Sequence, residues 1–430
     1  MTYLAPCYSY KNGTLYIDDV SLDMVAQSYE TPFYIYSATQ IKQNIQNLNK
    51  ALTQVLEPDQ YTVCYACKAL NNIAVMHFIA QQGCGADIVS SGELTRAIKA
   101  SVPADKIVFS GVGKSDQEIE HALNSNIRQI NVESGAELYR IEHIAKSLKI
   151  VAPVVFRLNP DVKAGAHDKI STGQKENKFG LNAQSVMELY QYAADSEYIN
   201  PRGISLHIGS QLIDMSPFDK AYKIAADFIQ GLRAKGFTPD TIDLGGGIGI
   251  IYDNEDAPDL DAYARIVEKH IAPLGLHMIF EPGRMIVGNA GLLVSRVLYI
   301  KEAENKSFLI TDAGMNDLMR PALYDSLHPV VEIIPKGKTA PVKKYDVVGP
   351  VCESADVFGL NIPLSEELTH NDLVAFTGAG AYGATMSSYY NARKLPAEFL
   401  VEGNDWRCIR RAITVEDFLR FETIDEDIYE

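Results

Sequence analysis

The sequence predicts an α/β protein, a (β/α)8 TIM barrel followed by a C-terminal antiparallel β domain. Short apolar runs alternate with amphipathic stretches over the first two thirds of the chain, and several runs recur every twenty to twenty-five residues. After about residue 288 the runs become short, β-branched and separated by turn residues, which is typical of antiparallel strands. A chain of 430 residues is long enough for both parts.

Eight apolar runs can be the strands of the barrel, and helical patterns such as residues 92–100 and 134–147 lie between them. The predicted strands are 62–66, 86–89, 107–110, 128–132, 153–158, 203–207, 240–244 and 277–281. Eight strand–helix units are typical of a (β/α)8 barrel. A doubly wound open sheet has a similar alternation and is the competing arrangement.

We expect three segments along the chain. Residues 34–287 would form the barrel and residues 288–430 the β domain. Residues 1–33 would be an N-terminal segment that joins the β domain. Within it, residues 8–17 (YSYKNGTLYI) place Asn-Gly between alternating residues, as a β-hairpin does.

Composition and charge exclude several classes of function. A net charge of −16 argues against nucleic acid or an anionic membrane surface as a partner. We find neither a signal-peptide pattern nor an apolar run of spanning length, and six scattered cysteines predict no disulfide framework, so we expect a cytoplasmic protein. Cys64 and Cys67 would point to opposite faces of a strand, and we expect no metal site.

Polar residues follow successive predicted strands. They are Lys68, residues 90–93, Gly111, Glu133, Arg157, Asn159, His207, residues 245–247, Glu281 and Arg284. In a (β/α)8 barrel the carboxyl ends of the strands share one rim, where the active site lies. The set therefore indicates an active site on this rim.

Lys68 is the residue of this set with the most specific chemistry. It directly follows a strongly apolar, β-branched segment, where a buried ammonium is costly. Desolvation lowers the pKa of a lysine, and a lysine that loses its proton easily can form a Schiff base. A lysine whose stem packs while its ammonium reaches water is the alternative.

Three groups beside Lys68 would complete a site for pyridoxal phosphate, which needs a phosphate cradle, a partner for its ring nitrogen and a group against its face. Residues 245–247 are three glycines after the seventh strand, where barrels bind phosphate, although a tight turn also uses glycine. Glu281 could hold the ring nitrogen protonated. His207 could stack on the ring or be a core histidine. Together with Lys68 these residues predict pyridoxal 5'-phosphate as the cofactor.

Seven motifs, in the order found here, resemble those of the meso-diaminopimelate decarboxylases. They are YACKA, HIGSQ, DLGGGIGI, EPGR, DAGMNDLMRPALY, GPVCES and GAYGATMSSYYN, and the resemblance runs from about residue 30 to about residue 420. This family belongs to the barrel-plus-β-domain group of pyridoxal phosphate enzymes, with alanine racemase and the eukaryotic ornithine decarboxylases. Its most specific parts are RPALY and CES. Ala355 stands where the family usually has glycine, and NARKLPAE replaces a more proline-rich version.

The resemblance implies how the cofactor is held. Lys68 would anchor it through a Schiff base and be displaced by the substrate amine, while Glu281 would hold the ring nitrogen protonated. Asp87, after the next strand, could keep Lys68 in place. The further cofactor-binding residues that we expect are His207, Ser210, Gly245, Gly246, Gly247, Gly283, Arg284 and Tyr382.

The resemblance also implies a decarboxylation with two catalytic residues, Lys68 and Cys352. Cys352 would reprotonate the α-carbon, Glu353 would bind the substrate amine and Tyr382 would contact both cofactor and substrate. For Cys352 the alternative is a buried small hydrophobe, which the polar neighbours Glu353 and Ser354 make less favoured.

Substrate choice would depend on the far end of the substrate. Diaminopimelate ends in a second amino acid centre, whose carboxylate needs a planar bidentate partner. Arg284, Arg320 and Tyr324 would supply it, whereas ornithine or lysine would need an acidic group there. The reaction would be the last step of lysine biosynthesis, releasing carbon dioxide and L-lysine. Its rivals are a decarboxylase for carboxynorspermidine, arginine or ornithine, and a non-catalytic pyridoxal phosphate-binding homologue.

The resemblance further implies an obligate homodimer, in which Cys352 and Glu353 reach into the barrel of the partner. Residues 163–178 (KAGAHDKISTGQKENK) are polar and contain glycine, which suits either a mobile lid or a solvated loop.

Overall fold

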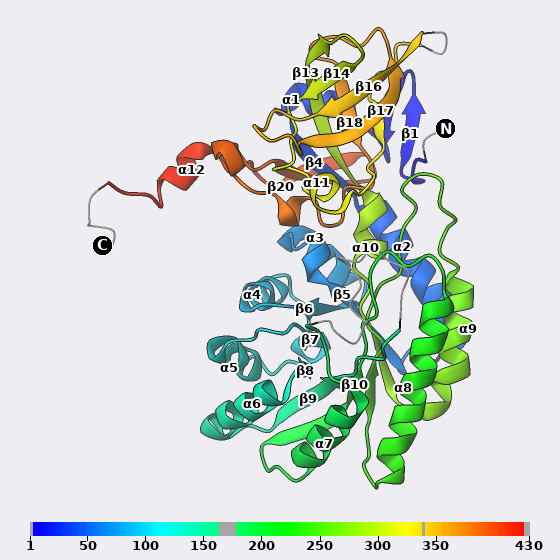
Figure 1. Cartoon of the computed structure of the whole chain (residues 1–430), viewed down its shortest axis with the longest axis vertical. Helices are drawn as coiled ribbons and strands as arrows, with labels where there is room; N and C mark the ends of the chain where they lie inside the picture. Colours follow the sequence, from blue (N-terminus) through cyan, green and yellow to red (C-terminus); the bar gives the residue numbers. More distant parts are fainter. Residues whose placement is uncertain (1–2, 163–177, 338–339, 425–430) are drawn as a thin grey trace. The chain divides into compact units, whose positions relative to one another are not determined.

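The computed structural model describes residues 3–162, 178–337 and 340–424. Of the loop considered as a lid, residues 163–177 lie outside the described residues. The chain forms two compact units (Figure 1). The barrel unit comprises residues 42–250 and 256–286, and the β unit comprises residues 1–41, 251–255 and 287–430.

The barrel unit contains a closed barrel of eight parallel strands, which confirms the predicted (β/α)8 fold and excludes an open sheet. The strands are β5 (Tyr61–Ala66), β6 (Gly85–Ile88), β7 (Ile107–Phe109), β8 (Gln129–Val132), β9 (Ala152–Arg157), β10 (Ile199–Ser205), β11 (Thr241–Asp243) and β12 (His277–Phe280). The barrel closes where β12 pairs with β5, Met278 opposite Tyr61. Each of the eight predicted strands overlaps one of these.

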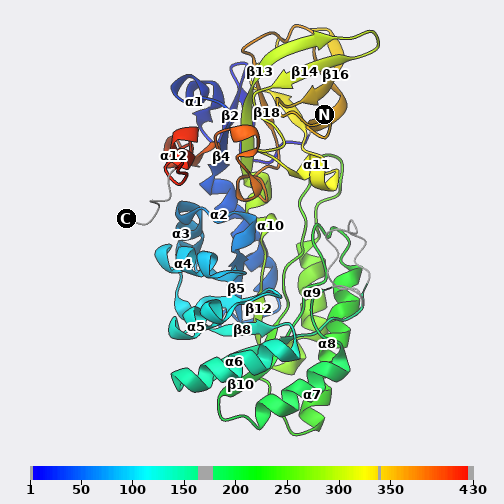
Figure 2. The same cartoon turned by 60° about the vertical axis from the view of Figure 1, so that its left-hand side comes forward.

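Helices alternate with the barrel strands and surround them (Figures 1 and 2). They are α2 (Ala38–Leu52), α3 (Ile73–Gln81), α4 (Ser91–Lys99), α5 (Asp116–Asn124), α6 (Gly135–Leu148), α7 (Ala183–Ala194), α8 (Ser216–Ala234), α9 (Leu260–His270) and the short α10 (Arg284–Val287). Polar N-cap side chains determine where several of them begin. Ser115 and Glu118 form a capping box on α5, and Ser134 accepts the amide of Glu137 on α6.

The interior of the barrel is apolar in one part and polar in another. Cys64, Val108 and Ile279 form a buried apolar cluster inside this unit. Asp243 on β11 hydrogen-bonds the side chains of Gln129 and Asn131 on β8, and all three side chains are buried. Because β8 and β11 are not neighbours in the barrel, these hydrogen bonds link strands across it.

The β unit contains a nine-stranded, mostly antiparallel sheet, as expected for the C-terminal part of the chain. Its strands are β4 (Phe33–Ser37), β13 (Gly291–Glu302), β14 (Ser307–Thr311), β15 (Val330–Glu332), β16 (Val342–Val348), β17 (Val357–Ser365), β18 (Leu373–Phe376), β19 (Ala397–Glu402) and β20 (Asp405–Arg410). The sheet is mixed rather than purely antiparallel, because β14 pairs with β16 and β4 with β19 in parallel.

The N-terminal hairpin forms where the Asn-Gly signal predicted it. Strands β1 (Tyr8–Lys11) and β2 (Thr14–Ile17) flank Asn12 and Gly13, which both have positive φ, at +51° and +79°, as this hairpin turn requires. With β3 (Val20–Ser21) they form a small separate sheet. Leu15 N donates to Ile333 O at 2.7 Å, so the hairpin joins the β unit as expected.

The remaining helices of the β unit are short. They are α1 (Leu22–Ser28), α11 (Arg320–Tyr324) and α12 (Val415–Leu419). Apolar side chains of the hairpin, β4, β13 and β19 share one buried core, which contains Ile17, Phe33, Leu292 and Phe399. Among the described residues, no helix is both long and apolar enough to cross a membrane.

Candidate active site

The carboxyl ends of five barrel strands carry most of the predicted site residues. The residues are Lys68 after β5, Asp87 on β6, His207 and Ser210 after β10, Gly245–Gly247 after β11, and Glu281, Gly283 and Arg284 after β12. Parallel strands bring their carboxyl ends to one rim, so residues more than 200 positions apart come together there. The charges of Lys68 and Asp87 both act on the pKa of Glu281, which indicates that these groups lie near one another.

Lys68 lies in a single turn of 3-10 helix, residues 67–69, that directly follows β5. Its Nζ lies 3.3 Å from Oδ2 of Asp87, which is fully buried, while the lysine side chain is about one-third exposed. The ammonium therefore has an ion-pair partner and can still be reached by a ligand. This is the contact that we expected from Asp87.

The turn that carries Lys68 packs against the loop after β12. Ala66 N donates to Pro282 O at 3.1 Å. A Cβ atom on Gly283 would lie 3.1 Å from the Cβ of Ala66 and 3.2 Å from that of Ala69. Glycine at 283 thus permits the close approach of the two loops that carry Lys68 and Glu281.

Glu281 is buried beside a second carboxyl group, that of Asp243. The two side chains are hydrogen-bonded to each other. Burial raises the pKa of Glu281 well above its usual value, and the charges of Asp243 and Asp87 raise it further. Oε1 of Glu281 is buried and has no hydrogen-bond partner among the described residues. Such an atom is unfavourable unless a ligand supplies the missing donor.

His207 is a neutral imidazole with a defined tautomer. Burial lowers its pKa well below the usual value, and the positive charges of Lys68 and Arg157 lower it further. Gly246 N donates to His207 Nδ1 at 3.4 Å, so the ring proton belongs on Nε2. A neutral ring is suited to stacking on an aromatic ligand.

The three glycines after β11 are required by close backbone packing. A Cβ on Gly245 would lie 2.2 Å from Leu206 O, and one on Gly246 would lie 2.1 Å from Glu281 O. Gly247 has φ of +118° and would meet Gly209 O at 2.6 Å. The loop is therefore a tight turn, which is one interpretation of the motif. Its backbone, which carries no side chains at these positions, also lies beside His207, and this supports the interpretation as a phosphate-binding loop.

Ser210 and Arg284 meet at the same rim. Arg284 Nη2 donates to Ser210 Oγ at 3.1 Å, and the arginine is buried at the start of α10. Gln211, which the sequence did not suggest, connects this loop to the glycine loop. Its side chain donates to Ile250 O at 2.6 Å and accepts from Ile250 N at 3.2 Å.

These barrel residues fit pyridoxal phosphate. Lys68 offers an amine to its aldehyde, Glu281 Oε1 offers a buried acceptor to its ring nitrogen, and His207 offers a flat neutral face. Glycine backbone with Ser210 and Arg284 offers donors to its phosphate.

Arg320 is the central predicted residue of the β unit, and its guanidinium donates hydrogen bonds to three side chains. Nη1 donates to the hydroxyl of Tyr252 and to Nε2 of His328, both at 2.8 Å, and Nη2 donates to Ser326 Oγ at 3.1 Å. His328 Nδ1 lies 3.0 Å from Thr377 O, which makes Nδ1 the donor and leaves Nε2 to accept from Arg320. The arginine is buried at the start of α11, and Tyr324 ends that helix.

Cys352 and Glu353 lie in an exposed loop of the β unit, so Cys352 is not the buried small hydrophobe that we considered as an alternative. The loop is fixed at both ends. Cys352 N donates to Asn391 Oδ1 at 3.0 Å, and Glu353 accepts from the hydroxyl of Tyr390 at 2.6 Å. Asp356 accepts the amide of Val351 at 2.7 Å.

Tyr382 has a positive φ of +57°, which a bulky residue adopts only at a cost. It lies in residues 380–383, where glycine precedes and follows it closely. Such strain is often found where a side chain must point at a ligand, and it supports a functional role for Tyr382.

Other rim residues have structural roles. Ser90 caps α4 by accepting the amide of Glu93, whose carboxylate accepts Val89 N. Arg157 pairs with Glu133 at 2.6 Å. Of the polar residues expected at the rim, those after β5, β10, β11 and β12 belong to the candidate site, whereas Ser90, Glu93, Glu133 and Arg157 serve as caps and ion pairs.

Sequence reasoning did not identify Asp243, Asn131, Tyr252 or His328. Asp243 lies two residues before the three glycines, and its place at a strand end was the available signal. Asn131 and Tyr252 become significant through contacts with residues far away in the chain, and His328 through its contact with Arg320, eight positions away.

Three comparisons with known proteins agree with this geometry. Residues 38–288 match the family model of the pyridoxal-dependent decarboxylases, pyridoxal binding domain. The chain is 45% identical over 403 residues to the diaminopimelate decarboxylase of Neisseria meningitidis serogroup A, covering 94% of this chain and 97% of that one.

Two solved structures are similar along nearly their whole length. Diaminopimelate decarboxylase from Helicobacter pylori, complexed with L-lysine, has a TM-score of 0.88 and 42% identity, covering 93% of this chain and 98% of that chain. The enzyme from M. jannaschii, also with L-lysine, has a TM-score of 0.93 and 36% identity, covering 99% of each.

Proposed function

Because the chain belongs to the diaminopimelate decarboxylase family, we propose that it converts meso-2,6-diaminopimelate to L-lysine and carbon dioxide with pyridoxal phosphate as cofactor. The observation that carries this proposal is the buried Glu281 carboxyl beside the Lys68–Asp87 pair on the barrel rim. The reaction would be the final step of lysine biosynthesis, and we place the enzyme in the cytoplasm.

The barrel residues hold the cofactor. Lys68 binds the aldehyde carbon of the cofactor. Before the cofactor is bound, Asp87 holds the ammonium of Lys68 at the rim. Glu281 presents Oε1 to the ring nitrogen, and His207 covers a ring face. The phosphate is bound by Ser210, Arg284 and the loop Gly245–Gly247, with Gly283 permitting the close packing of that rim. Pyridoxal phosphate, when bound, accepts the electron pair that the leaving carbon dioxide releases.

Arg320 reads the far carboxylate of the substrate. Its planar guanidinium is buried and oriented by hydrogen bonds to Tyr252 and His328, which suits a bidentate contact with a carboxylate ligand. Arg284 and Tyr324 assist at the same carboxylate, and Tyr382 contacts both substrate and cofactor. A substrate without this carboxylate loses the charged interaction and leaves polar groups unsatisfied.

Cys352 supplies the proton to the α-carbon, and Glu353 binds the substrate amine. Both lie on the exposed, well-anchored loop that Asn391 and Tyr390 fix, and this supports their presentation to a second copy of the chain. We therefore propose an obligate homodimer in which each Cys352 and Glu353 serve the partner's barrel.

The experiment that tests the activity is carbon dioxide release from a panel of amino acids. We expect release from meso-diaminopimelate, with L-lysine as product, and at least about 1,000-fold lower kcat/KM for ornithine, arginine and carboxynorspermidine, because they lack the far amino acid centre. A preference for any of these three would refute the role of Arg320. Reductive trapping of cofactor on Lys68 without turnover of any substrate would indicate a non-catalytic homologue.

The shared site has its own test. Chains carrying Lys68→Ala and chains carrying Cys352→Ala are each inactive, and mixing them in equal amounts creates dimers with one intact site. We expect recovery of up to about a quarter of the wild-type activity, since half the chains pair unlike and each such dimer has one good site of two. No recovery on mixing would contradict a site shared between copies.

A further inference from the structure

A chain of buried polar side chains crosses the barrel beneath the rim. Gln129 and Asn131 are alternate residues of β8 and therefore share one face of the strand. Gln129 Nε2 donates to Asn131 Oδ1 at 2.9 Å, and Asn131 Nδ2 donates to Asp243 Oδ2 at 3.0 Å. Their exposure is 2% or less. Uncharged amides in a barrel interior are costly unless they serve a partner, and the partner here is Asp243.

Asp243 accepts hydrogen bonds from three donors. Asn131 and Gln129 donate to its Oδ2, at 3.0 and 3.4 Å, while Gly245 N donates to its Oδ1 at 3.0 Å. Burial raises its pKa to about 6, but the donors from Asn131 and Gly245 favour the charged form. The next carboxyl group, that of Glu281, must then provide a proton between them.

The pair Asp243–Glu281 shares this proton. The two carboxyl groups are hydrogen-bonded to each other, and both are buried. Two buried carboxyl groups in contact cannot both be ionised at moderate cost. The pair therefore carries one proton and one negative charge.

The other charged and titratable groups near the pair are few. Asp87 on β6 and Lys68 after β5 act on Glu281 with opposite signs, and Cys64 on β5 faces both carboxyl groups. Tyr222 and Tyr263, on α8 and α9, hydrogen-bond each other at 2.7 Å and lie near Asp243. Because Lys68 compensates the charge of Asp87, the proton is shared between the carboxyl groups of Asp243 and Glu281.

We propose that Asp243, fixed by Gln129, Asn131 and Gly245, is a positioning residue that shares one proton with Glu281 and holds the Glu281 carboxyl group toward the ring nitrogen of the cofactor. The pair then presents one negative charge to the protonated ring. This inference rests on the proposed function in that Glu281 faces the cofactor ring, whereas the shared proton is a property of the chain alone.

The test is infrared spectroscopy of the full chain at pH 8.5, with cofactor bound and after its removal. A protonated carboxyl group absorbs apart from carboxylates. We expect one such band in the wild type, lost in Asp243→Asn and equally in Glu281→Gln, because either change ends the sharing. Asp240→Asn is the matched control. Asp240 is the exposed residue just before β11, paired with Arg202, and its substitution should leave the band intact.

Cofactor affinity is the second readout. In Asp243→Asn the amide donates to Glu281 and competes with the ring nitrogen for its charge, so the dissociation constant, measured by fluorescence, should rise about tenfold while Asp240→Asn leaves it unchanged. If Asp243→Asn does not fold, Asn131→Ala should shift the band by removing one donor to Asp243.

A band that persists in Asp243→Asn, or one that Asn131→Ala does not move, would overturn the shared proton. Because the spectra do not depend on turnover, these outcomes are separate from a failure of the proposed decarboxylation, which would leave the band in place.

Discussion

The two units bury charge of opposite sign at their predicted functional residues. In the barrel unit, three buried carboxyl groups, those of Asp87, Asp243 and Glu281, lie close to the single ammonium of Lys68. In the β unit, the guanidinium of Arg320 is buried and hydrogen-bonded to Tyr252 and His328. Buried carboxyl groups are suited to a cationic ring, and a planar guanidinium is suited to a carboxylate.

The units also differ in how they hold these residues. The barrel carries them at the ends of five of its eight paired strands, where regular hydrogen bonding fixes the backbone. The β unit carries them on a short helix, on an exposed loop and on a residue with positive φ, Tyr382. Loops tolerate changes of sequence more easily than strand ends do. The strand ends are therefore suited to binding the cofactor, and the loops are suited to determining the substrate. The predictions below separate these two roles.

The largest effect is expected for Lys68→Ala. Without the amine the cofactor has no covalent anchor, and kcat should fall by about 1,000-fold or more, with loss of the absorbance of the bound cofactor. Lys106→Ala is the control, because its ammonium contacts only the carbonyl of Gly83 among the interactions that we describe. Retention of most activity in Lys68→Ala would contradict the assignment.

Glu281→Gln should lower kcat by about 100-fold. An amide cannot hold the ring nitrogen protonated, so the electron pair left by carbon dioxide is stabilised less, whereas substrate binding in the β unit is unaffected and KM stays within a factor of about three. Glu268→Gln, on the exposed face of α9, is the control. A change in KM alone would place Glu281 in substrate binding instead.

His328→Gln should act in the opposite way, on KM. It removes the acceptor that orients Arg320 Nη1, and we expect KM for diaminopimelate to rise about fivefold to tenfold with kcat nearly unchanged. His370→Gln, an exposed histidine of the same unit, should change neither. A fall in kcat without a rise in KM would show that His328 does not act through substrate binding.

The smallest effect is a pH dependence of stability. The pKa of Glu281 is raised in the folded chain, so the folded chain binds more protons than the unfolded chain above pH 4.5. Its contribution is complete below that value and is lost as pH rises toward the raised pKa. Between pH 4.5 and the raised pKa the cofactor-free wild type should therefore lose up to about 1.4 kcal/mol of unfolding free energy per pH unit relative to Glu281→Gln. Parallel curves in denaturant unfolding would contradict the raised pKa.

The barrel and its rim were predictable from the sequence because both have local signals. Apolar runs marked every strand of the barrel, and Lys68, the three glycines and Glu281 each follow such a run directly. Strand pairing order has no local signal, which is why the parallel pairs β4–β19 and β14–β16 of the β unit were not expected.

Residues that act across the fold were not predictable. Gln129 and Asn131 alternate with apolar residues, as polar residues do on any strand with one solvent-exposed face. Only closure of the barrel brings them to Asp243. Tyr252 reaches Arg320 from 68 positions away, so neither residue suggests the other. Cys352 was identified as functional by resemblance, and its exposure distinguishes it from an ordinary core cysteine.

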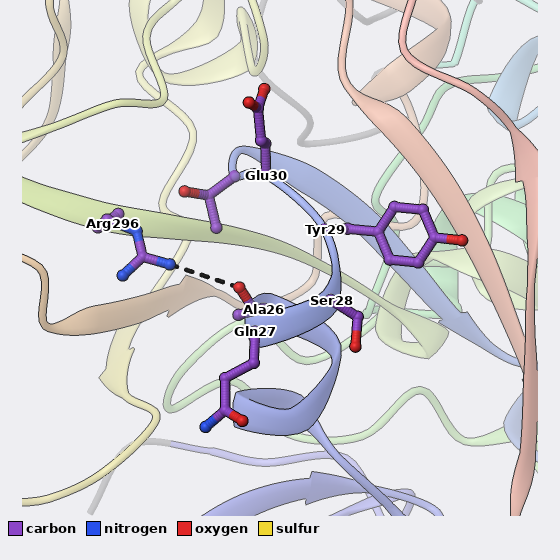
Figure 3. Close-up of a pocket in the computed structure, with 7 residues that line it drawn as sticks. Ala26, Gln27, Ser28, Tyr29, Glu30 and Arg296 are labelled. Atoms are coloured by element: carbon purple, nitrogen blue, oxygen red, sulfur yellow. Dashed lines mark hydrogen bonds between the residues drawn. The ribbon is translucent and has the colours of Figure 1, made fainter.

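The central claim is that Arg320 selects substrates by their far carboxylate. D-Lysine has the reacting centre of meso-diaminopimelate but lacks the far carboxylate, so the ratio of kcat/KM for diaminopimelate and D-lysine isolates the recognition of that carboxylate. A second arginine of the β unit provides a matched control. Arg296 lines an open surface pocket with residues 26–31, where its Nη2 donates to Ala26 O at 3.5 Å (Figure 3).

The most direct measurement is therefore this ratio in the wild type, in Arg320→Lys and in Arg296→Lys. Lysine keeps the charge but loses the planar bidentate contact, so the ratio should fall by about 100-fold in Arg320→Lys, through loss of activity on diaminopimelate alone, and stay constant in Arg296→Lys. An unchanged ratio in Arg320→Lys would contradict the account.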